Sequence, residues 1–393
     1  MKLLITGASG FLGKYVTAAA LRKGHQVRAV VRPASDSSVI PWAKHPNVEF
    51  ARFDLRRRAG IAESLVDIDA VIHLAAAKAG DFYTQFGGTV LATENLLMAM
   101  VEKDVKRLIA ISTFSVYDYI NIESEETLDE SSPLVKDTAS RDEYAQTKLL
   151  QEQLVRDFES KQGGLITVLR PGVIYGKDNL WTARLGASLG ERWWLRIGAQ
   201  SQLPLSYVEN CADAIVMATE QEGAIGQTIN IFDDNPPTQR EYAKQLKAQV
   251  PNPPRFVPMN WMLVRSVGDL AWFVNQKLLG GKAKLPGVLI PSRLDARFKP
   301  LQYSNQKLKT CLGWEPRYGL KDAIARSLDN QNHFAVTTTA VLSESSELPE
   351  SNGSKVTDSR STDTGPSNPE PVSPEPASPE PASPEPVGTE SAS

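Results

Sequence analysis

Short apolar stretches alternate with longer amphipathic stretches along the first half of the chain, at intervals of roughly twenty residues. Each apolar stretch suits one buried strand, and the segments between them have the length and mixed character of helices. This alternation predicts βαβ units and a parallel, doubly wound α/β sheet. The predicted strands are 2–6, 27–31, 48–53, 70–74, 107–111 and 165–169, with a short strand at 229–232, and the clearest helices are 11–23 and 89–103.

The second half of the chain predicts a smaller, mostly helical C-terminal lobe. The periodicity loosens after Gly172, and the following stretch is rich in Trp and Arg, which fits either a substrate pocket or a helix packed on the sheet. We expect a cofactor-binding core at about 1–172 and 206–232, and a substrate lobe at 173–205 and 233–335. Beyond it, 336–393 is dominated by Pro, Ser, Thr and Glu, which predicts a disordered tail.

The turn after the first predicted strand carries Gly7, Gly10 and Gly13 at three-residue intervals. In a strand–turn–helix connection the first glycine permits a tight bend, the second allows close approach to a pyrophosphate, and the third lets the helix pack on the strand. Unpaired N–H groups at the start of the helix would hold the anion. The turn therefore predicts dinucleotide binding, with an ordinary glycine-rich turn as the alternative.

Other residues at strand ends refine this prediction, because ligands bind beyond the carboxyl ends of such strands. Arg32 follows Val31 with no carboxylate before Asp36, which favours NADP over NAD, with an ordinary solvated cation at a strand end as the alternative. Asp54, followed by Leu55, could accept a hydrogen bond from adenine, or could be an ordinary surface aspartate. Small residues at Ala75 and Ala76 would let the backbone pass close to the middle of the dinucleotide, and Ser112 and Thr113 follow the fifth strand.

Tyr144 and Lys148 lie four residues apart in a predicted helix and therefore share one face. A neighbouring positive charge favours the phenolate of a tyrosine, whose ordinary pKa is about 10. Such a tyrosine can act as a general acid or base near neutral pH. The pair occurs often by chance, and its significance here comes from the nucleotide turn and the Ser112–Thr113 hydroxyls upstream.

Composition excludes several classes of function. The chain has 393 residues and a net charge of −3, which gives no basic footprint for nucleic acid. Its two cysteines and four histidines show no metal-ligand spacing, so no metal site is expected. No uncharged run reaches the ~18 residues of a spanning helix, and with no signal peptide we expect a cytoplasmic protein. The amphipathic run from Met259 to Val274 predicts core packing, with contact to a membrane surface or an apolar substrate as the alternative.

Together these motifs resemble the extended short-chain dehydrogenase/reductase family, the NAD(P)-dependent epimerase/dehydratase type with a Rossmann fold. The resemblance covers about residues 1–330 and rests on TGASGFLG, VIHLAA, ISTFSVY, the Tyr144–Lys148 pair, LRPGVIYG, SYVENCADA and LGWEPRYGLKDAI. Asn210, where nucleotide-sugar epimerases usually have aspartate, makes the chain more similar to the 3β-hydroxysteroid dehydrogenase and dihydroflavonol reductase branch.

The resemblance implies roles for individual residues. Thr113, Tyr144 and Lys148 match the catalytic group, and the lysine also binds the nicotinamide ribose. The matching cofactor contacts are Gly7, Gly10, Phe11, Leu12, Gly13, Asp54, Leu55, Ala75, Ala76, Pro171 and Val173, to which Arg32 is added for NADP. Thr89 stands where the family often has asparagine, so that role is not transferred. A homodimer through the helices at 89–103 and 144–160 is a family expectation.

The expected function is hydride transfer between NADP or NAD and a secondary alcohol or ketone of a small, apolar substrate. A nucleotide-sugar epimerase or dehydratase is the alternative within the family, and there the cofactor would show no net change. A non-catalytic nucleotide-sensing protein is a third hypothesis, although such proteins often lose the tyrosine or lysine that this chain keeps.

Overall fold

A computed structural model describes residues 1–335 except 37, 139–140, 182, 190–192, 281–282 and 284. The tail predicted at 336–393 lies outside the described residues. None of the helices in the described part of the chain has the length and apolarity needed to cross a lipid bilayer.

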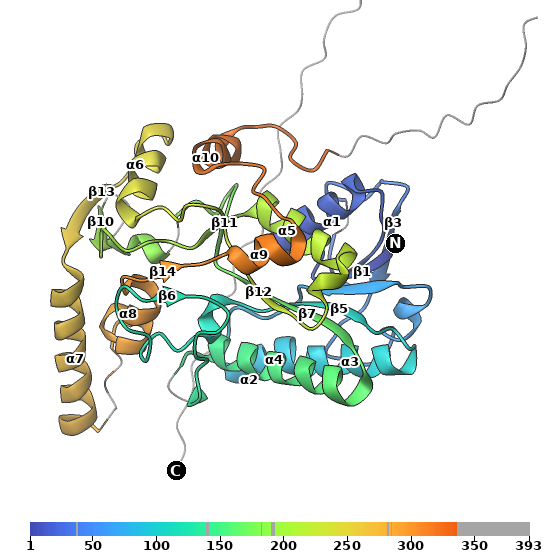
Figure 1. Ribbon diagram of the computed structural model, residues 1–393, viewed down its shortest axis with the longest axis horizontal. Helices are drawn as coiled ribbons and strands as arrows, with labels where there is room; N and C mark the ends of the chain where they lie inside the picture. The colour runs from blue at the N-terminus through green and yellow to red at the C-terminus, as the bar shows by residue number, and fades with distance from the viewer. Residues whose placement is uncertain are drawn as a thin grey trace, which may run out of the picture. The chain divides into compact units, whose positions relative to one another are not determined.

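A seven-stranded parallel sheet forms the centre of the fold (Figure 1). Its strand order is β12 (Thr228–Ile231), β7 (Leu165–Pro171), β5 (Arg107–Ile111), β4 (Ala70–His73), β1 (Lys2–Thr6), β2 (Gln26–Val31) and β3 (Val48–Arg52). The chain proceeds outward from β1 in one direction and from β4 in the other, so the strand order reverses between these two strands. Doubly wound sheets bind their ligands in the crevice at such a reversal.

Helices cover both faces of the sheet, which explains why its strands are continuous apolar runs. Helices α1 (Phe11–Arg22) and α5 (Val208–Glu220) pack together on one face, and α3 (Ala92–Glu102) and α4 (Glu143–Gln162) cover the other (Figure 1). In β1, Leu3 and Ile5 belong to the core beneath α1, while Leu4 belongs to the core beneath α3 and α4. The predicted doubly wound architecture is therefore confirmed.

The helix predicted at 89–103 begins earlier and is not uniform. Helix α2 (Phe82–Phe86) continues through a π-helical turn, η2 (Gly87–Leu91), directly into α3. A Cβ on Gly88 would lie 2.8 Å from the Cβ of Ala77, so this turn packs tightly against the segment that follows β4. The π turn thus lies next to the part of the sheet edge where the dinucleotide is expected.

Helix α4, which carries Tyr144 and Lys148, is fixed at its start and along its length. The Asp142 side chain caps it by accepting a hydrogen bond from the N–H of Ala145 at 3.0 Å. Deeper in the fold, the guanidinium of Arg170 on β7 makes a two-pronged ion pair with Glu152, at 2.9 and 2.6 Å. Both ends of this pair are buried, so the helix is held in one register against the sheet.

The part of the chain in which we expected a mostly helical C-terminal lobe contains β-structure as well as helices. Described strands within 187–197 replace the helix that was one interpretation of the Trp- and Arg-rich stretch, and Trp194 packs on Trp181 and Phe256. The remaining elements are β6 (Thr127–Leu128), β8 (Val173–Tyr175), β9 (Ala187–Leu189), β10 (Trp193–Ile197), β11 (Leu205–Tyr207), β13 (Arg255–Met259) and β14 (Gln302–Tyr303), with α6 (Gln239–Gln249), α7 (Trp261–Leu278), α8 (Pro291–Phe298), α9 (Gln306–Leu312) and α10 (Leu320–Leu328).

Candidate functional site

A cavity of about 880 Å³ opens at the carboxyl edge of the sheet, where the strand order reverses. Every residue predicted to contact the cofactor or substrate lines this cavity except Val173, whose neighbours Gly172 and Ile174 line it instead. Residues that the sequence did not single out also line it, among them Arg56, Lys78 and Asn179. The structure thus brings the predicted site residues of six strand ends together around one space.

The glycine turn has the shape that a dinucleotide requires. Gly7 adopts φ +69°, which L residues with side chains rarely adopt, and a Cβ there would lie 3.0 Å from the N atom of Ala75. A Cβ on Gly13 would lie only 2.1 Å from the carbonyl oxygen of Gly7, so α1 starts in direct contact with the turn. Gly10 caps α1 without a side chain, which leaves the first N–H groups of the helix free to bind an anion. This cradle fits a pyrophosphate.

Two arginines lie at the end of the cavity formed by β2 and β3. The side chain of Arg32 makes no hydrogen bond or ion pair with any residue that the structure describes, and it is exposed. The guanidinium of Arg56 binds the carboxylate of Asp54, with Nε 3.0 Å from both oxygens, and this hydrogen bonding lowers the pKa of Asp54. Arg56 was missed because it belongs to a run of three arginines, 56–58, that looks like an exposed turn in the sequence.

Thr113 and Tyr144 meet at the opposite end of the cavity. Thr113 follows β5 and caps a short 3₁₀ turn by accepting a hydrogen bond from the N–H of Ser115 at 3.2 Å. Tyr144 is the second residue of α4. Burial raises the pKa of Tyr144 to about 12, opposed by a hydrogen bond with Thr113. The protein surroundings of Tyr144 by themselves therefore keep its phenol protonated at neutral pH.

Lys148 is buried one helical turn below Tyr144 and is held by two acceptors. Its Nζ donates to the carbonyl oxygen of Ile111 and to Oε1 of Gln151, both at 2.8 Å. Burial, with a smaller contribution from Lys78, lowers the pKa of Lys148 to about 7. An ammonium has three donors, so one N–H remains for the cavity that Lys148 lines.

Gln151 connects the lysine to a buried chain of hydrogen bonds. Nε2 of Gln151 donates to Oγ1 of Thr93 at 2.9 Å, and Oγ1 of Thr93 donates to the carbonyl oxygen of Thr89 at 2.6 Å. With its own proton used in this way, Thr93 accepts from Nε2 of His73, 2.9 Å away. His73 therefore carries its proton on Nε2, and Nδ1 accepts from the hydroxyl of Thr6 at 2.8 Å.

This assignment gives every donor and acceptor in the series of hydrogen bonds a partner without requiring a charged histidine. Oγ1 of Thr6 in turn accepts from the N–H groups of Leu74 and Ala75, both at 3.2 Å. Burial, together with the charge of Lys148, lowers the pKa of His73 to about 3, which agrees with a neutral imidazole. Gln151 and His73 both donate hydrogen bonds to Thr93. This series of hydrogen bonds therefore positions Lys148 and the end of β4 and does not conduct protons between them.

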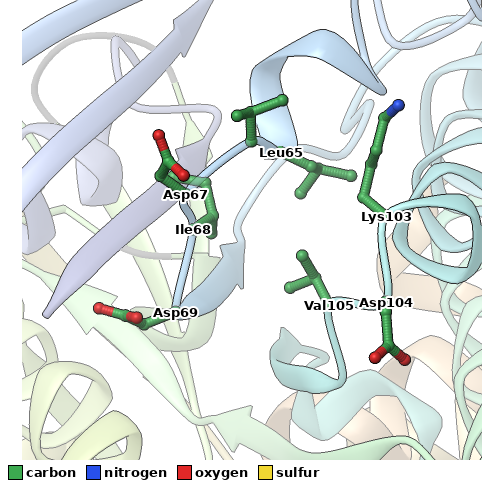
Figure 2. A pocket seen from close by; sticks show the side chains of 8 residues that line it. Leu65, Asp67, Ile68, Asp69, Lys103, Asp104 and Val105 are labelled. Carbon is green, nitrogen blue, oxygen red and sulfur yellow. The ribbon is translucent and has the colours of Figure 1, made fainter.

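A second pocket lies at the opposite, amino edge of the sheet (Figure 2). Two of its charged residues are engaged locally: Lys103 pairs with Glu102 at 3.0 Å, and Asp69 accepts a hydrogen bond from the N–H of Lys2 at 2.7 Å. Figure 2 shows the charged groups of Asp67, Asp69, Lys103 and Asp104 spread around the rim rather than converging on one point. This pocket lacks the arrangement of a catalytic site, and we assign the chemistry to the carboxyl edge.

Asn210 lies outside the cavity and stabilises the fold. Its amide donates to Oδ1 of Asp233 and to the carbonyl oxygen of Tyr318, both at 2.9 Å, and its Oδ1 accepts from the N–H of Tyr318 at 3.1 Å. The residue is fully buried. The side chain that marked the branch of the family therefore joins α5 to the C-terminal segment and does not contact a substrate bound in the cavity.

The model of the NAD dependent epimerase/dehydratase family matches residues 3–231. A 2-alkyl-3-oxoalkanoate reductase from Stenotrophomonas maltophilia is 30% identical over 339 residues, which cover 83% of this chain and 98% of the relative. A 3-beta-hydroxysteroid dehydrogenase from Mycolicibacterium neoaurum is 26% identical over 351 residues, covering 83% and 90% of the two chains.

Among solved structures, the NAD complex of UDP-glucuronic acid 4-epimerase from Bacillus cereus is similar in fold, with a TM-score of 0.62 at 21% identity, covering 83% of this chain and 97% of that one. The family predicted from the motifs is thus confirmed. The chain belongs to the NAD dependent epimerase/dehydratase family of enzymes.

Proposed function

We propose that this enzyme transfers a hydride between a nicotinamide cofactor and a secondary alcohol or ketone of a small, apolar substrate. The observation that carries the proposal is the placement of Thr113, Tyr144 and Lys148 at one end of a glycine-lined cavity. The names of relatives support it, since a hydroxysteroid dehydrogenase and an oxoalkanoate reductase both act on a hydroxyl or carbonyl group of a largely apolar molecule.

Each of the three residues has a distinct role in this proposal. The hydroxyl of Thr113 donates a hydrogen bond to the substrate oxygen and orients it towards Tyr144. Tyr144 takes or returns the hydroxyl proton. The free N–H of Lys148 binds the nicotinamide ribose, and a positive charge on its ammonium favours the phenolate form of a nearby tyrosine. When bound, the nicotinamide would supply the hydride chemistry, and its oxidised ring would add a second positive charge near Tyr144.

We propose NADP as the preferred cofactor. Arg32 is exposed and without a partner in the described part of the chain, and Arg56, which is paired with Asp54, lines the same cavity. A 2′-phosphate adds negative charge at this end of a bound dinucleotide, and arginine binds such a group through two parallel hydrogen bonds. The glycine cradle accepts the pyrophosphate of either cofactor, so the choice between them depends on these two guanidinium groups.

The experiment is a paired assay of nicotinamide absorbance and product identity on hydroxysteroids, other apolar alcohols and nucleotide sugars, each with NAD⁺ and NADP⁺. We expect net reduction of NADP⁺ by an apolar alcohol. Tyr144→Phe should lower turnover by roughly 10²–10⁴-fold, whereas the exposed Tyr83→Phe should have no effect. A rearranged nucleotide sugar with no net absorbance change would replace this proposal with an epimerase or dehydratase. Full turnover by Tyr144→Phe would refute the proton-transfer role.

A further inference from the structure

Helix α7 presents its most apolar residues to solvent. Met262, Leu263, Leu270 and Phe273 are 57% to 75% exposed, although they are large and apolar. The buried positions of the same helix are smaller or polar, namely Val264, Gly268 and Asn275. The prediction that this amphipathic run packs its apolar face in the core is therefore wrong, and the stronger apolar face lies on the outside.

The inner face of α7 explains this orientation. Gly268 allows a close approach to α8, since a Cβ there would lie 2.9 Å from Cδ1 of Leu294. Near its end, Asn275 exchanges two hydrogen bonds of 3.0 Å with the backbone of Ala283. These contacts use small and polar groups, so the helix is attached to the lobe while its large side chains remain without a partner in the described part of the protein.

Neighbouring residues extend the exposed face. Strand β13 runs directly into α7, and the two form the outer edge of the lobe in Figure 1, with α8 on the inner side. Val257 on β13 is partly exposed, and so is Trp193, which pairs with Arg255 across β10 and β13. The guanidinium of Arg255 lies 5.5 Å from the ring centre of Trp193. Trp and Arg together are typical of residues that sit at a boundary between lipid and water.

The charge around this face identifies its partner. The described residues of the stretch 255–299 include six Lys and Arg residues but only two acidic residues, and Arg255 and Lys277 lie on β13 and α7 themselves. Both acidic residues, Asp269 and Asp295, already pair with Arg265, so they do not offset the other cations. A second copy would bring the same positive charge to the interface. The acidic sequence of 336–393 contains no aromatic residue to match the apolar face.

We propose that the face formed by α7, β13 and Trp193 docks this enzyme on the surface of an anionic lipid bilayer. The helix lies in the plane of the interface, with Leu270 and Phe273 among the acyl chains and Lys277 near the headgroups. The proposal does not depend on the reaction that the cavity catalyses.

The test is co-sedimentation of the full chain with vesicles made of an equal mixture of phosphatidylcholine and phosphatidylserine, compared with phosphatidylcholine alone. We expect binding to the mixed vesicles that weakens as salt is raised. The double variant Leu270→Glu with Phe273→Glu should bind roughly tenfold less tightly or worse, and Lys277→Glu should weaken binding mainly at low salt. The matched control, Val39→Glu with Val66→Glu, changes two apolar residues that are exposed elsewhere.

Turnover and cofactor affinity in solution should be unchanged in all of these variants, which separates the result from loss of the fold. Failure of the unmodified protein to sediment with the mixed vesicles would overturn the proposal, as would equal binding by the double variant. A dimer in light scattering that the double variant converts to a monomer would also overturn it, because a second copy would then occupy the face.

Discussion

Replacement of Gln151 by methionine tests whether this residue sets the charge of Lys148. The substitution keeps the length of the side chain but removes the oxygen that accepts a hydrogen bond from Nζ at 2.8 Å. A hydrogen bond to a charged group contributes about 1.5–3 kcal/mol. Because one pKa unit corresponds to about 1.4 kcal/mol, the pKa of Lys148 should fall by about one to two pH units from its already lowered value of about 7.

Because the substitution lowers the pKa of Lys148, its effect on cofactor binding should appear at high pH and not at low pH. In the proposed mechanism, the positive form of Lys148 holds the ribose and assists Tyr144, and this form is lost as pH rises through the pKa of Lys148. Below about pH 5 both proteins keep the charge, and cofactor affinity should be nearly the same. Above pH 7 the variant should bind about tenfold to a hundredfold more weakly.

The assay is the dissociation constant for NADPH between pH 5 and pH 9, followed by tryptophan fluorescence, together with kcat/KM over the same range. Gln153→Met is the matched control, since Gln153 is exposed on the same helix. A variant whose cofactor affinity fell by the same factor at every pH would show that Gln151 supports only the fold. An unchanged pH profile would refute the link between Gln151 and the charge of Lys148.

The lowered pKa of Lys148 also predicts a cost in stability. The unfolded chain binds more protons than the folded protein between about pH 7 and the ordinary lysine pKa of about 10.4, so the free energy of unfolding rises with pH in this interval. Lys148→Met should therefore raise the thermal midpoint below pH 7 while abolishing turnover. A lower midpoint at pH 6 would contradict this account of the buried ammonium.

The remaining predictions concern the cradle, the cofactor and the fold. Gly13→Ala should lower the melting temperature and cofactor affinity, because its Cβ would overlap the Gly7 carbonyl, whereas Gly223→Ala, whose Cβ would lie at an ordinary 3.6 Å from the carbonyl oxygen of Cys311, should change both far less in calorimetry. Arg32→Ala should reduce the preference for NADP⁺ over NAD⁺ in kcat/KM by roughly tenfold or more, and an unchanged ratio would remove this residue from cofactor choice. Glu152→Gln should cost about 3–5 kcal/mol in denaturant unfolding, since it leaves a buried guanidinium without its charge partner. Asn210→Asp would place a second carboxyl group beside Asp233, whose pKa burial already raises to about 7, so the folded variant would hold protons that the unfolded chain releases above about pH 4; its stability should fall progressively as pH rises from about 4 towards 7, and a loss independent of pH would contradict this.

The strands of the central sheet and the site at its edge could be predicted because each depends on local sequence. Strand β1 is buried on both faces and is therefore apolar at every internal position, and Gly7 follows it immediately. Once the strands are parallel, their carboxyl ends share one edge whatever their exact packing. The positions of Thr113 and Tyr144 at one end of the cavity follow from this rule together with the family resemblance.

Other features depend on contacts that the sequence does not encode locally. Gln151 looks like a surface residue of a helix, and its partner Thr93 is 58 positions away. Only its spacing of three residues after Lys148, which puts both on one helical face, could have indicated a contact. The apolar stripe of α7 was visible in the sequence, but a periodic pattern does not specify whether the stripe faces the protein or another partner.

The π turn at Gly87–Leu91 makes the length of this segment important for the site. Each residue added to or removed from an α-helix rotates the following side chains by about 100°. In the present phase Thr93 contacts His73 and Gln151, and the amide of Asn95 donates to the carbonyl oxygen of Leu55 at 2.9 Å. A π turn takes up about one residue more than an α-helical turn, so the side chains after it keep nearly the phase that a regular helix one residue shorter would give them. We therefore expect evolution to tolerate the loss of one residue within this turn more readily than the same deletion inside α3, which would turn Thr93 and Asn95 away from their partners.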